Sequence, residues 1–173
     1  MEFVQQDARV TPHYFKDDGL VPNSGFPLMV YQGVISVNGN DPAQAFEHVF
    51  SVNRWARTWR NGIYSFHHYH STAHEVLGIA KGSAEVCMGG EQGARFTIGP
   101  GDVMVVPAGV GHKNLGASSD LLVVGGYPDG QNPDLCKESD GEHRQALVNI
   151  PNVPLPVADP VFGIDGPMMD HWK

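Results

Sequence analysis

The sequence predicts an all-β protein built as a sandwich or a barrel. Residues 63–127 form short segments rich in β-branched and aromatic residues, separated by glycine-containing turns. The chain contains 21 Gly and 13 Pro, which favours many short strands over long helices. No helix-length pattern interrupts the strands, so a parallel α/β sheet is not expected.

The length of 173 residues, 41% of them hydrophobic, suits one domain with its own core. We expect residues 1–173 to form a single domain whose barrel core spans about residues 58–130. Before it, residues 1–57 supply an extended N-terminal arm, interrupted by prolines, and then a helix. Residues 28–37 read L-M-V-Y-Q-G-V-I-S-V and predict a strand between arm and helix.

A helix is predicted from about Pro42 to Arg57. Asp41 is a good N-cap residue, and proline suits the first helical position. Phe46 and Phe50 are spaced for one helical face. Three arginines, Arg54, Arg57 and Arg60, lie toward the C-terminal end of this segment. Cations there complement the helix dipole, and the alternative role is to bind an anionic substrate.

The barrel strands are expected at regular intervals. The segments are I-Y-S-F-H-H-Y-H (63–70), E-V-L-G-I-A (75–80), S-A-E-V-C-M (83–88), A-R-F-T-I (94–98), D-V-M-V-V-P (102–107) and D-L-L-V-V-G-G-Y (120–127). Past Tyr127 the chain is polar and acidic to about Glu142, which predicts a loop. The proline-rich residues 143–173 are then expected to form an extended C-terminal tail.

Charge and hydropathy limit the classes of partner. The formal net charge is −8 with only 11 Lys+Arg, and no basic cluster occurs. We therefore expect neither nucleic acid nor a membrane surface as a partner. The N-terminus lacks the pattern of a signal peptide and no run reaches membrane-spanning length, so a cytoplasmic location is expected. Cys87 and Cys136 are expected to be reduced thiols.

Histidines gather between Gly62 and Gly82. His68 and His70 are one residue apart, so in a strand both side chains share one face. Glu75 follows after a short break, and two imidazoles with one carboxylate make most of a metal site. His112 follows a tight turn after another strand, from where its side chain can reach back over the sheet.

Without a metal, these four buried polar side chains would have to satisfy one another's hydrogen-bonding groups. A buried carboxylate beside three imidazoles needs charge compensation, which a cation supplies. His67 alternates to the face opposite His68. His74 falls between two strands, where an exposed loop position is the simpler interpretation and proton transfer the alternative.

Four aromatic residues are candidates to line a substrate cavity, although aromatic residues on strands more often belong to the core. Phe66 is expected to point inward, since it shares a strand face with His68. The four candidates are Tyr64, Phe66, Tyr69 and Tyr127.

Two motifs resemble those of the cupin (RmlC-like) superfamily. The first, G-x5-H-x-H-x4-E-x6-G, is matched in full by Gly62, His68, His70, Glu75 and Gly82. The second, G-x5-P-x-G-x2-H-x3-N, is matched by Gly101, Pro107, Gly109 and His112, with Gly116 in the place of the asparagine. The chain is also similar to bacterial single-domain cupins in its order of helix, barrel and proline-rich tail.

This resemblance implies a double-stranded β-helix, or jelly-roll barrel, with one helix before the barrel and extended N- and C-terminal arms. It implies a divalent transition metal (Fe2+, Mn2+, Ni2+ or Zn2+) near one mouth of the barrel. The implied ligands are His68, His70, Glu75 and His112. It also implies a homodimer in which both arms could be exchanged.

Such a metal site has open positions for dioxygen, water or a chelating small molecule. The leading hypothesis is an Fe(II)-type dioxygenase or other oxidoreductase that acts on a small-molecule substrate. The alternatives are a non-redox metal-dependent isomerase, a non-catalytic small-molecule-binding or sensory protein, and a structural or storage protein. The sequence assigns no catalytic residue and no particular substrate.

Overall fold

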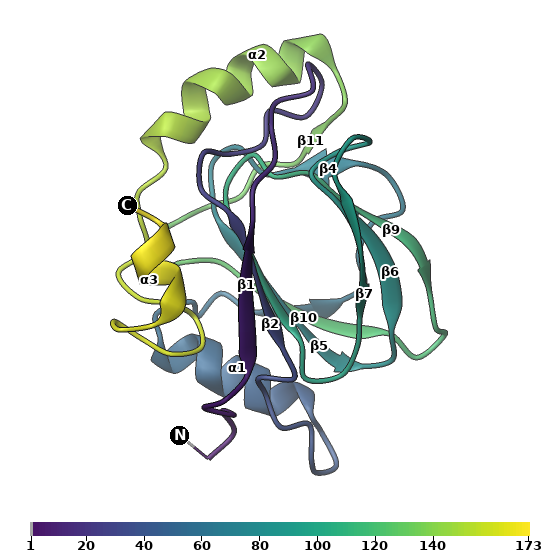
Figure 1. Ribbon diagram of the computed structural model, residues 1–173, viewed down its shortest axis with the longest axis vertical. Helices are drawn as coiled ribbons and strands as arrows, with labels where there is room; N and C mark the ends of the chain where they lie inside the picture. The colour runs from purple at the N-terminus through teal and green to yellow at the C-terminus, as the bar shows by residue number, and fades with distance from the viewer. Residues whose placement is uncertain (1) are drawn as a thin grey trace.

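The computed structural model describes residues 2–173 as two antiparallel sheets that face each other and enclose a barrel (Figure 1). The order is β1-β2-β8-β5-β10-β3 in one sheet and β11-β4-β9-β6-β7 in the other. This arrangement confirms the predicted all-β jelly-roll barrel. The strands are β1 Arg9–His13, β2 Leu28–Gln32, β3 Trp59–Asn61, β4 His68–Tyr69, β5 Glu75–Lys81, β6 Ala84–Met88, β7 Ala94–Ile98, β8 Val103–Val106, β9 His112–Ala117, β10 Leu122–Gly126 and β11 Cys136–Lys137. The helices are α1 Ala43–Val52, α2 Asp140–Asn149 and α3 Pro167–His171, with a 3-10 turn at Ile150–Asn152.

The four central strands of the six-stranded sheet, β2, β8, β5 and β10, are buried on both faces, which explains why they are mostly apolar rather than alternating. Leu77 and Ile79 of β5 lie in the cluster between the two sheets. Val76 and Ala80 of the same strand belong to the cluster on the outer side. Because side chains alternate along a strand, Glu75 at the start of β5 shares the inner face with Leu77.

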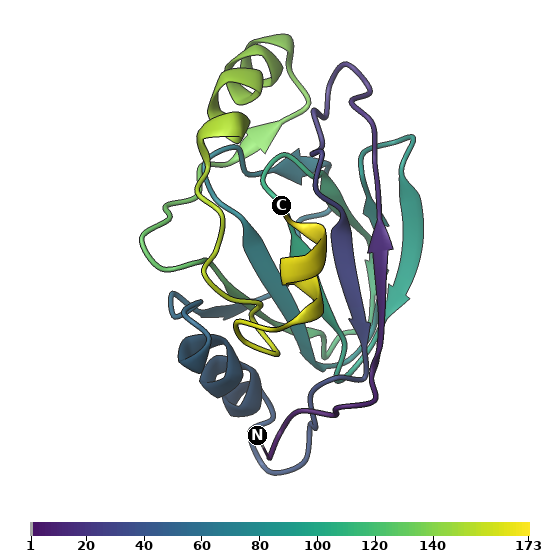
Figure 2. The same ribbon diagram turned by 60° about the vertical axis from the view of Figure 1, so that its left-hand side comes forward.

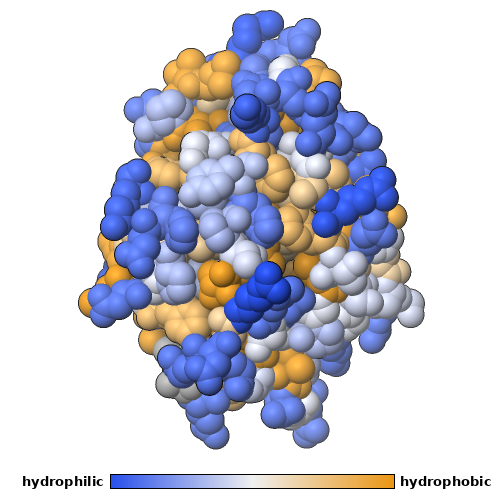
Figure 3. All heavy atoms as spheres, in the orientation of Figure 1, coloured by the Kyte–Doolittle hydropathy of each residue, from blue (hydrophilic) through white to orange (hydrophobic). Residues whose placement is uncertain are grey.

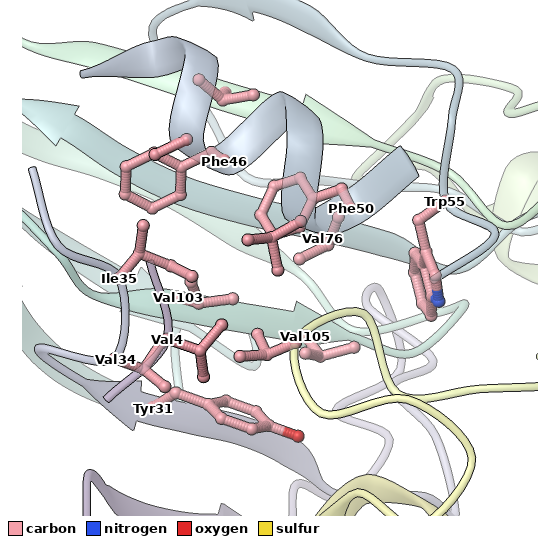
Figure 4. Close-up of a cluster of buried hydrophobic side chains, with 14 of the residues drawn as sticks. Val4, Tyr31, Val34, Ile35, Phe46, Phe50, Trp55, Val76, Val103 and Val105 are labelled. Carbon is pink, nitrogen blue, oxygen red and sulfur yellow. The ribbon is translucent and has the colours of Figure 1, made fainter. Parts of the chain in front are cut away.

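Helix α1 covers the outer face of this sheet. Phe46 and Phe50 lie over valines of β5 and β8 in one fully buried cluster (Figure 4). The helix approaches β5 so closely that a Cβ atom at Gly78 would overlap the Phe46 ring. Gly78 is thus the point at which the helix seats on the sheet.

The predicted extent of the helix, Pro42 to Arg57, is wrong at its C-terminal end. The helix ends at Val52, and Arg54 adopts a left-handed φ of 70°. This turn buries Trp55, whose Nε1 donates to the Ala158 carbonyl at 2.9 Å. At the other end Pro42 occupies the N-cap position without a side-chain cap bond, so Asp41 does not cap the helix as predicted.

The three arginines therefore do not complement a helix dipole. Arg54 pairs with Asp129 at 2.7 Å. Arg60 lies on β3 and pairs with Asp41 and Glu47 at 3.0 and 2.6 Å. Arg57 donates to the Gln131 carbonyl at 3.0 Å. All three arginines thus connect neighbouring segments to one another.

The N-terminal arm is extended, as predicted, and β1 pairs antiparallel with β2 at the edge of the larger sheet. Pro12 is tolerated there because an edge strand leaves one row of N–H groups unpaired. The thiols of Cys87 and Cys136 are free and buried on β6 and β11.

The prediction of a loop followed by an extended tail is wrong between residues 136 and 149. This segment forms β11 and then α2. Ser139 is the N-cap residue of α2, and its Oγ accepts a hydrogen bond from the Glu142 N–H at 3.3 Å. Only Ala146 of this helix is buried, so apolar periodicity does not reveal it.

Beyond α2 the tail is anchored on the same outer face as α1, and Figure 2 shows α3 beside α1 on that side. The Tyr31 hydroxyl donates to the buried Asp159 carboxylate at 2.5 Å. Trp172 donates from Nε1 to the Pro27 carbonyl at 2.9 Å. These bonds hold the tail against the strands of the larger sheet. Within residues 2–173, no helix is long and apolar enough to span a membrane.

Gly78→Ala is expected to lower the free energy of unfolding by about 1–3 kcal/mol, because the added methyl group overlaps the buried Phe46 ring. Gly116→Ala is the matched control, since a Cβ there meets no atom within 4 Å. Urea unfolding followed by circular dichroism measures both. Equal stabilities of the two variants would contradict the tight seating of α1.

Candidate metal centre

Strands of both sheets bring the predicted ligands together. His68 and His112 are register partners across β4 and β9, and their ring centroids are 4.0 Å apart. His70 follows β4 directly, with its ring centroid 5.7 Å from that of His112. Glu75 enters from the opposite sheet as the first residue of β5.

The turn before His112 is tied to the backbone of His70. Gly109 adopts a φ of +97°, and a Cβ there would overlap the Asn23 carbonyl oxygen. The N–H of Gly109 donates to the His70 carbonyl at 2.8 Å. Glycine at this position lets the turn fold closely enough to set the two histidines side by side.

The donor atoms converge on one small volume. His68, His70 and His112 each offer a ring nitrogen within 4.8 Å of the others. The Glu75 Oε2 atom lies 3.3 Å from His70 Nε2 and 3.1 Å from His112 Nε2. Glu75 is only 3% exposed, and its Oε2 has no hydrogen-bond partner.

Backbone carbonyls fix the tautomer of all three histidines. The Nδ1 atoms of His68 and His112 donate to the carbonyls of Phe66 and Val110 at 3.0 and 3.1 Å. His70 Nδ1 donates to the Asp134 carbonyl. Because a carbonyl can only accept, each Nδ1 carries a proton, and each Nε2 faces the centre, where it can bind a metal ion or, in His70, a second proton.

This geometry fits a divalent metal ion. Three imidazole nitrogens meet in a mostly buried place, and an unpartnered carboxylate oxygen lies beside two of them, so a cation there would be bound by nitrogen and balanced by the negative charge. Imidazole nitrogen with one carboxylate suits a first-row transition metal. The residues that could hold the ion are His68, His70 and His112, with the Glu75 carboxylate beside the last two.

The pKa values of His68, His70 and Glu75 show how the protein compensates the buried carboxylate without a metal ion. Burial lowers the pKa of His68 to about 3, helped by the charge of His112, so that ring is neutral. Burial also acts to lower the pKa of His70, but the Glu75 carboxylate outweighs it and raises that pKa to about 9. Burial opposes ionisation of Glu75, yet the charges of His70 and His112 hold its pKa well below the ordinary value. A metal ion would replace the His70 proton as the partner of this carboxylate.

The centre forms part of the wall of a cavity of about 430 Å³, a size typical of small-molecule sites. Aromatic and aliphatic side chains make up most of the remaining wall. The lining residues are Trp59, Asn61, Gly62, Ile63, Tyr64, His68, His70, Glu75, Leu77, His112, Tyr127, Pro133, Asp134 and Leu135.

The other two histidines of the cluster lie away from the centre. His67 faces away, as predicted, and its Nε2 pairs with Glu91 at 2.8 Å. The interpretation of His74 as an exposed loop residue is wrong, since it is buried against Trp172 and accepts from the Ala108 N–H at 2.9 Å. His74 does not line the cavity, so its position gives it no proton-transfer role there.

Two of the four aromatic candidates line the cavity, namely Tyr64 and Tyr127. Tyr69 is fully buried in a separate cluster with Cys136. Phe66 stacks on Tyr64 but does not line the cavity. The expectation for Phe66 fails because β4 is only two residues long, so strand alternation does not extend back to it.

The segment from Pro133 to Leu135 is a cavity wall that the sequence does not reveal. The Asp134 carboxylate accepts from the Ser71 N–H at 2.6 Å and from the Ser71 hydroxyl. The Asp134 N–H donates to Thr72 Oγ1 at 3.0 Å. These bonds clamp the segment onto the loop after β4 and hold the carbonyl that orients His70.

Fold and site together define a cupin, and sequence comparison confirms it. The sequence model of the cupin domain matches residues 60–124. The chain is 37% identical over 161 residues to a Bacillus subtilis (strain 168) protein named Uncharacterized protein YjlB, covering 92% of this chain and 94% of that protein. The chain therefore belongs to the cupin superfamily.

Two solved structures are more distant. The chain is 26% identical to a DUF861 family protein from Thermotoga maritima, covering 46% of this chain and 84% of that one, with a TM-score of 0.32. It is 20% identical to Bacillus subtilis oxalate decarboxylase, studied for its Mn(II) centres, covering 68% of this chain and 29% of that one, with a TM-score of 0.35.

Asp134→Ala is expected to weaken metal binding about tenfold, because the carbonyl that orients His70 loses its clamp. Asp129→Ala is the control, since Asp129 pairs only with the segment around Arg54. Competition with a chromophoric chelator gives the dissociation constant of each variant. An unchanged constant for Asp134→Ala would show that His70 is held without the clamp.

Proposed function

We propose that this cupin binds a divalent transition metal through His68, His70, Glu75 and His112 and acts on a small molecule in the adjacent cavity. The supporting observation is that three imidazole nitrogens lie close together, and that two of them, in His70 and His112, approach an unpartnered, buried carboxylate oxygen. Among chemistries, we favour an Fe(II)-type dioxygenase or another oxidoreductase. When bound, the metal supplies open coordination positions for dioxygen and for a chelating substrate.

The residues of the chain have separate roles in this proposal. The three histidines bind the ion, and Glu75 both binds it and offsets one unit of its charge. Trp59 Nε1 donates to the Tyr127 hydroxyl oxygen at 3.0 Å, so the Tyr127 hydrogen is available to the Glu75 carboxylate or to a ligand oxygen in its place. Burial, with the charge of Glu75, raises the pKa of Tyr127 to about 12, so the phenol keeps that proton at neutral pH. Apolar walls limit the access of water.

A non-catalytic small-molecule-binding protein is the second candidate. It is favoured by the cavity wall, whose described residues outside the three histidines and Glu75 include no further histidine, lysine or cysteine that could act as a general acid or base. A non-redox isomerase needs a general base beside the substrate. His74, the sequence's candidate for that task, lies outside the cavity.

Metal analysis tests the site. Protein purified without added metal is expected to hold about one equivalent of transition metal, and His112→Ala is expected to lose most of it because one of four ligands is removed. His67→Ala is the matched control, as this neighbouring histidine faces Glu91 instead. Full metal retention in His112→Ala would overturn the four-ligand proposal.

Oxygen consumption separates the two functional candidates. The iron-loaded protein is expected to take up dioxygen with at least one member of a panel of thiols, catechols and diketones. The His112→Ala variant loaded in the same way should not. Metal binding without uptake for any compound would favour the binding protein over the oxygenase.

We also propose that the chain forms a homodimer and works in the cytoplasm. Exposed apolar side chains on α2 and the segment after it support an interface there, and Figure 3 shows hydrophobic atoms at the surface in the region of α2. They are Leu147, Val148, Leu155 and Val157. Sedimentation equilibrium is expected to give twice the chain mass for wild type and a weaker dimer for Val148→Asp, with Val52→Asp on α1 as the control. A monomeric wild type would contradict this.

A further inference from the structure

We propose that the cavity beside the metal takes a small, flat, mostly apolar ligand that carries at most one negative charge and binds the metal through oxygen atoms. This ligand class rests on the proposed metal site and makes it specific. Three properties of the wall support it, namely its rings, its charges and its hydrogen-bond donor.

The rings of the wall already contact one another or neighbouring residues before any ligand binds. Trp59 lies across its β10 register partner Gly125 so closely that a Cβ there would overlap the indole. Its Nε1 is engaged by Tyr127. Tyr64 stacks on Phe66 at 4.9 Å and stands perpendicular to the His68 ring at 5.1 Å. Such pre-ordered faces suit a planar ligand, because little side-chain freedom is lost on binding.

The charges of the wall disfavour a strongly anionic ligand. Among residues 2–173, the charged side chains apart from histidine that line the cavity are Glu75 and Asp134, and neither Lys nor Arg contributes. The nearby Arg57 donates to Gln131 and Asn132 instead. A ligand with two negative charges would thus face two carboxylates with one divalent ion to balance them.

The polar groups of the wall fit a single oxygen-bearing end. The Tyr127 hydroxyl can donate one hydrogen bond beside Glu75 and His70. Asn61 Oδ1 is already engaged by the N–H of Gly62 at 2.8 Å. The apolar side chains of Ile63, Leu77 and Leu135 also line the cavity. A hydroxyl or carbonyl oxygen on an aromatic or unsaturated ring matches this division.

Three probe ligands distinguish the contribution of an aromatic ring to affinity from that of the metal-binding group. Benzohydroxamate and acetohydroxamate share one oxygen chelating head and differ by the ring, while oxalate is a chelating dianion. Binding to cobalt-loaded protein of measured metal content is followed by calorimetry. Benzohydroxamate is expected to bind at least about tenfold more tightly than acetohydroxamate, since its ring is buried on the apolar wall. Oxalate is expected to bind no more tightly than acetohydroxamate.

Two variants test the wall itself. Trp59→Ala and Tyr64→Ala are expected to reduce the preference for the ring to below about threefold, with metal content and acetohydroxamate affinity unchanged. Tyr64 is 54% exposed, so its variant folds even where loss of Trp59 disturbs β3. Tyr14→Ala, at a tyrosine that is 65% exposed outside the cavity, is the control and should keep the full preference.

The failures of the two proposals are distinguishable. Stoichiometric metal with equal affinities for the two hydroxamates, or with oxalate the tightest, overturns the ligand class and leaves the metal site standing. Protein that takes up no cobalt overturns the metal site and the ligand class with it. A ring preference that survives both Trp59→Ala and Tyr64→Ala overturns the assignment to this wall.

Discussion

The arrangement around Glu75 is the constraint on which the rest of the site depends. A buried carboxylate is costly unless charge and hydrogen bonds compensate it, and here two imidazole nitrogens approach one of its oxygens without a hydrogen bond. The carbonyls of Phe66, Val110 and Asp134 hold the protons of the three histidines on the far side of each ring. The hydrogen bonds to the backbone thus orient each Nε2 atom toward the centre, where a cation can bind, and not toward a hydrogen bond with another histidine.

Such an arrangement needs a scaffold that does not relax, and the six-stranded sheet supplies it. Both of its faces are buried, one by the facing sheet and the other by α1 and the C-terminal tail. Gly78 brings α1 onto the strand that begins with Glu75, so packing on the outer face fixes the position of the carboxylate inside. The tail contributes through Asp159 and Trp172, which bind the larger sheet from outside. Segments far from the cavity therefore determine its geometry.

The sequence predicts that His68, His70 and His112 come together, because their spacing relative to strands and turns determines it. His68 and His70 share a strand face because side chains alternate, and the turn residues before His112 predict that the chain folds back close to them. It does not predict the Asp134 clamp, since the group that orients His70 is a backbone carbonyl, which every residue possesses. Nor does it predict the burial of His74, which depends on Trp172 almost one hundred residues later in the chain. The early end of α1 has a similar cause, because burial of Trp55 overrides the local preference for helix.

Helix α2 shows which sequence features still indicate a helix when few of its side chains are buried. Ser139 and Glu142 have the spacing of a capping box, and the structure uses both side chains at the helix start. The apolar pattern that ordinarily accompanies such a cap is missing because the helix buries only Ala146. Asn149, the last residue of this helix, donates to Ser71 Oγ at 3.0 Å, so α2 is bonded to the same loop to which the Asp134 segment is bonded. The C-terminal region is thereby linked to the loop that carries His70, and the geometry of the metal centre depends on residues that no metal-binding motif contains.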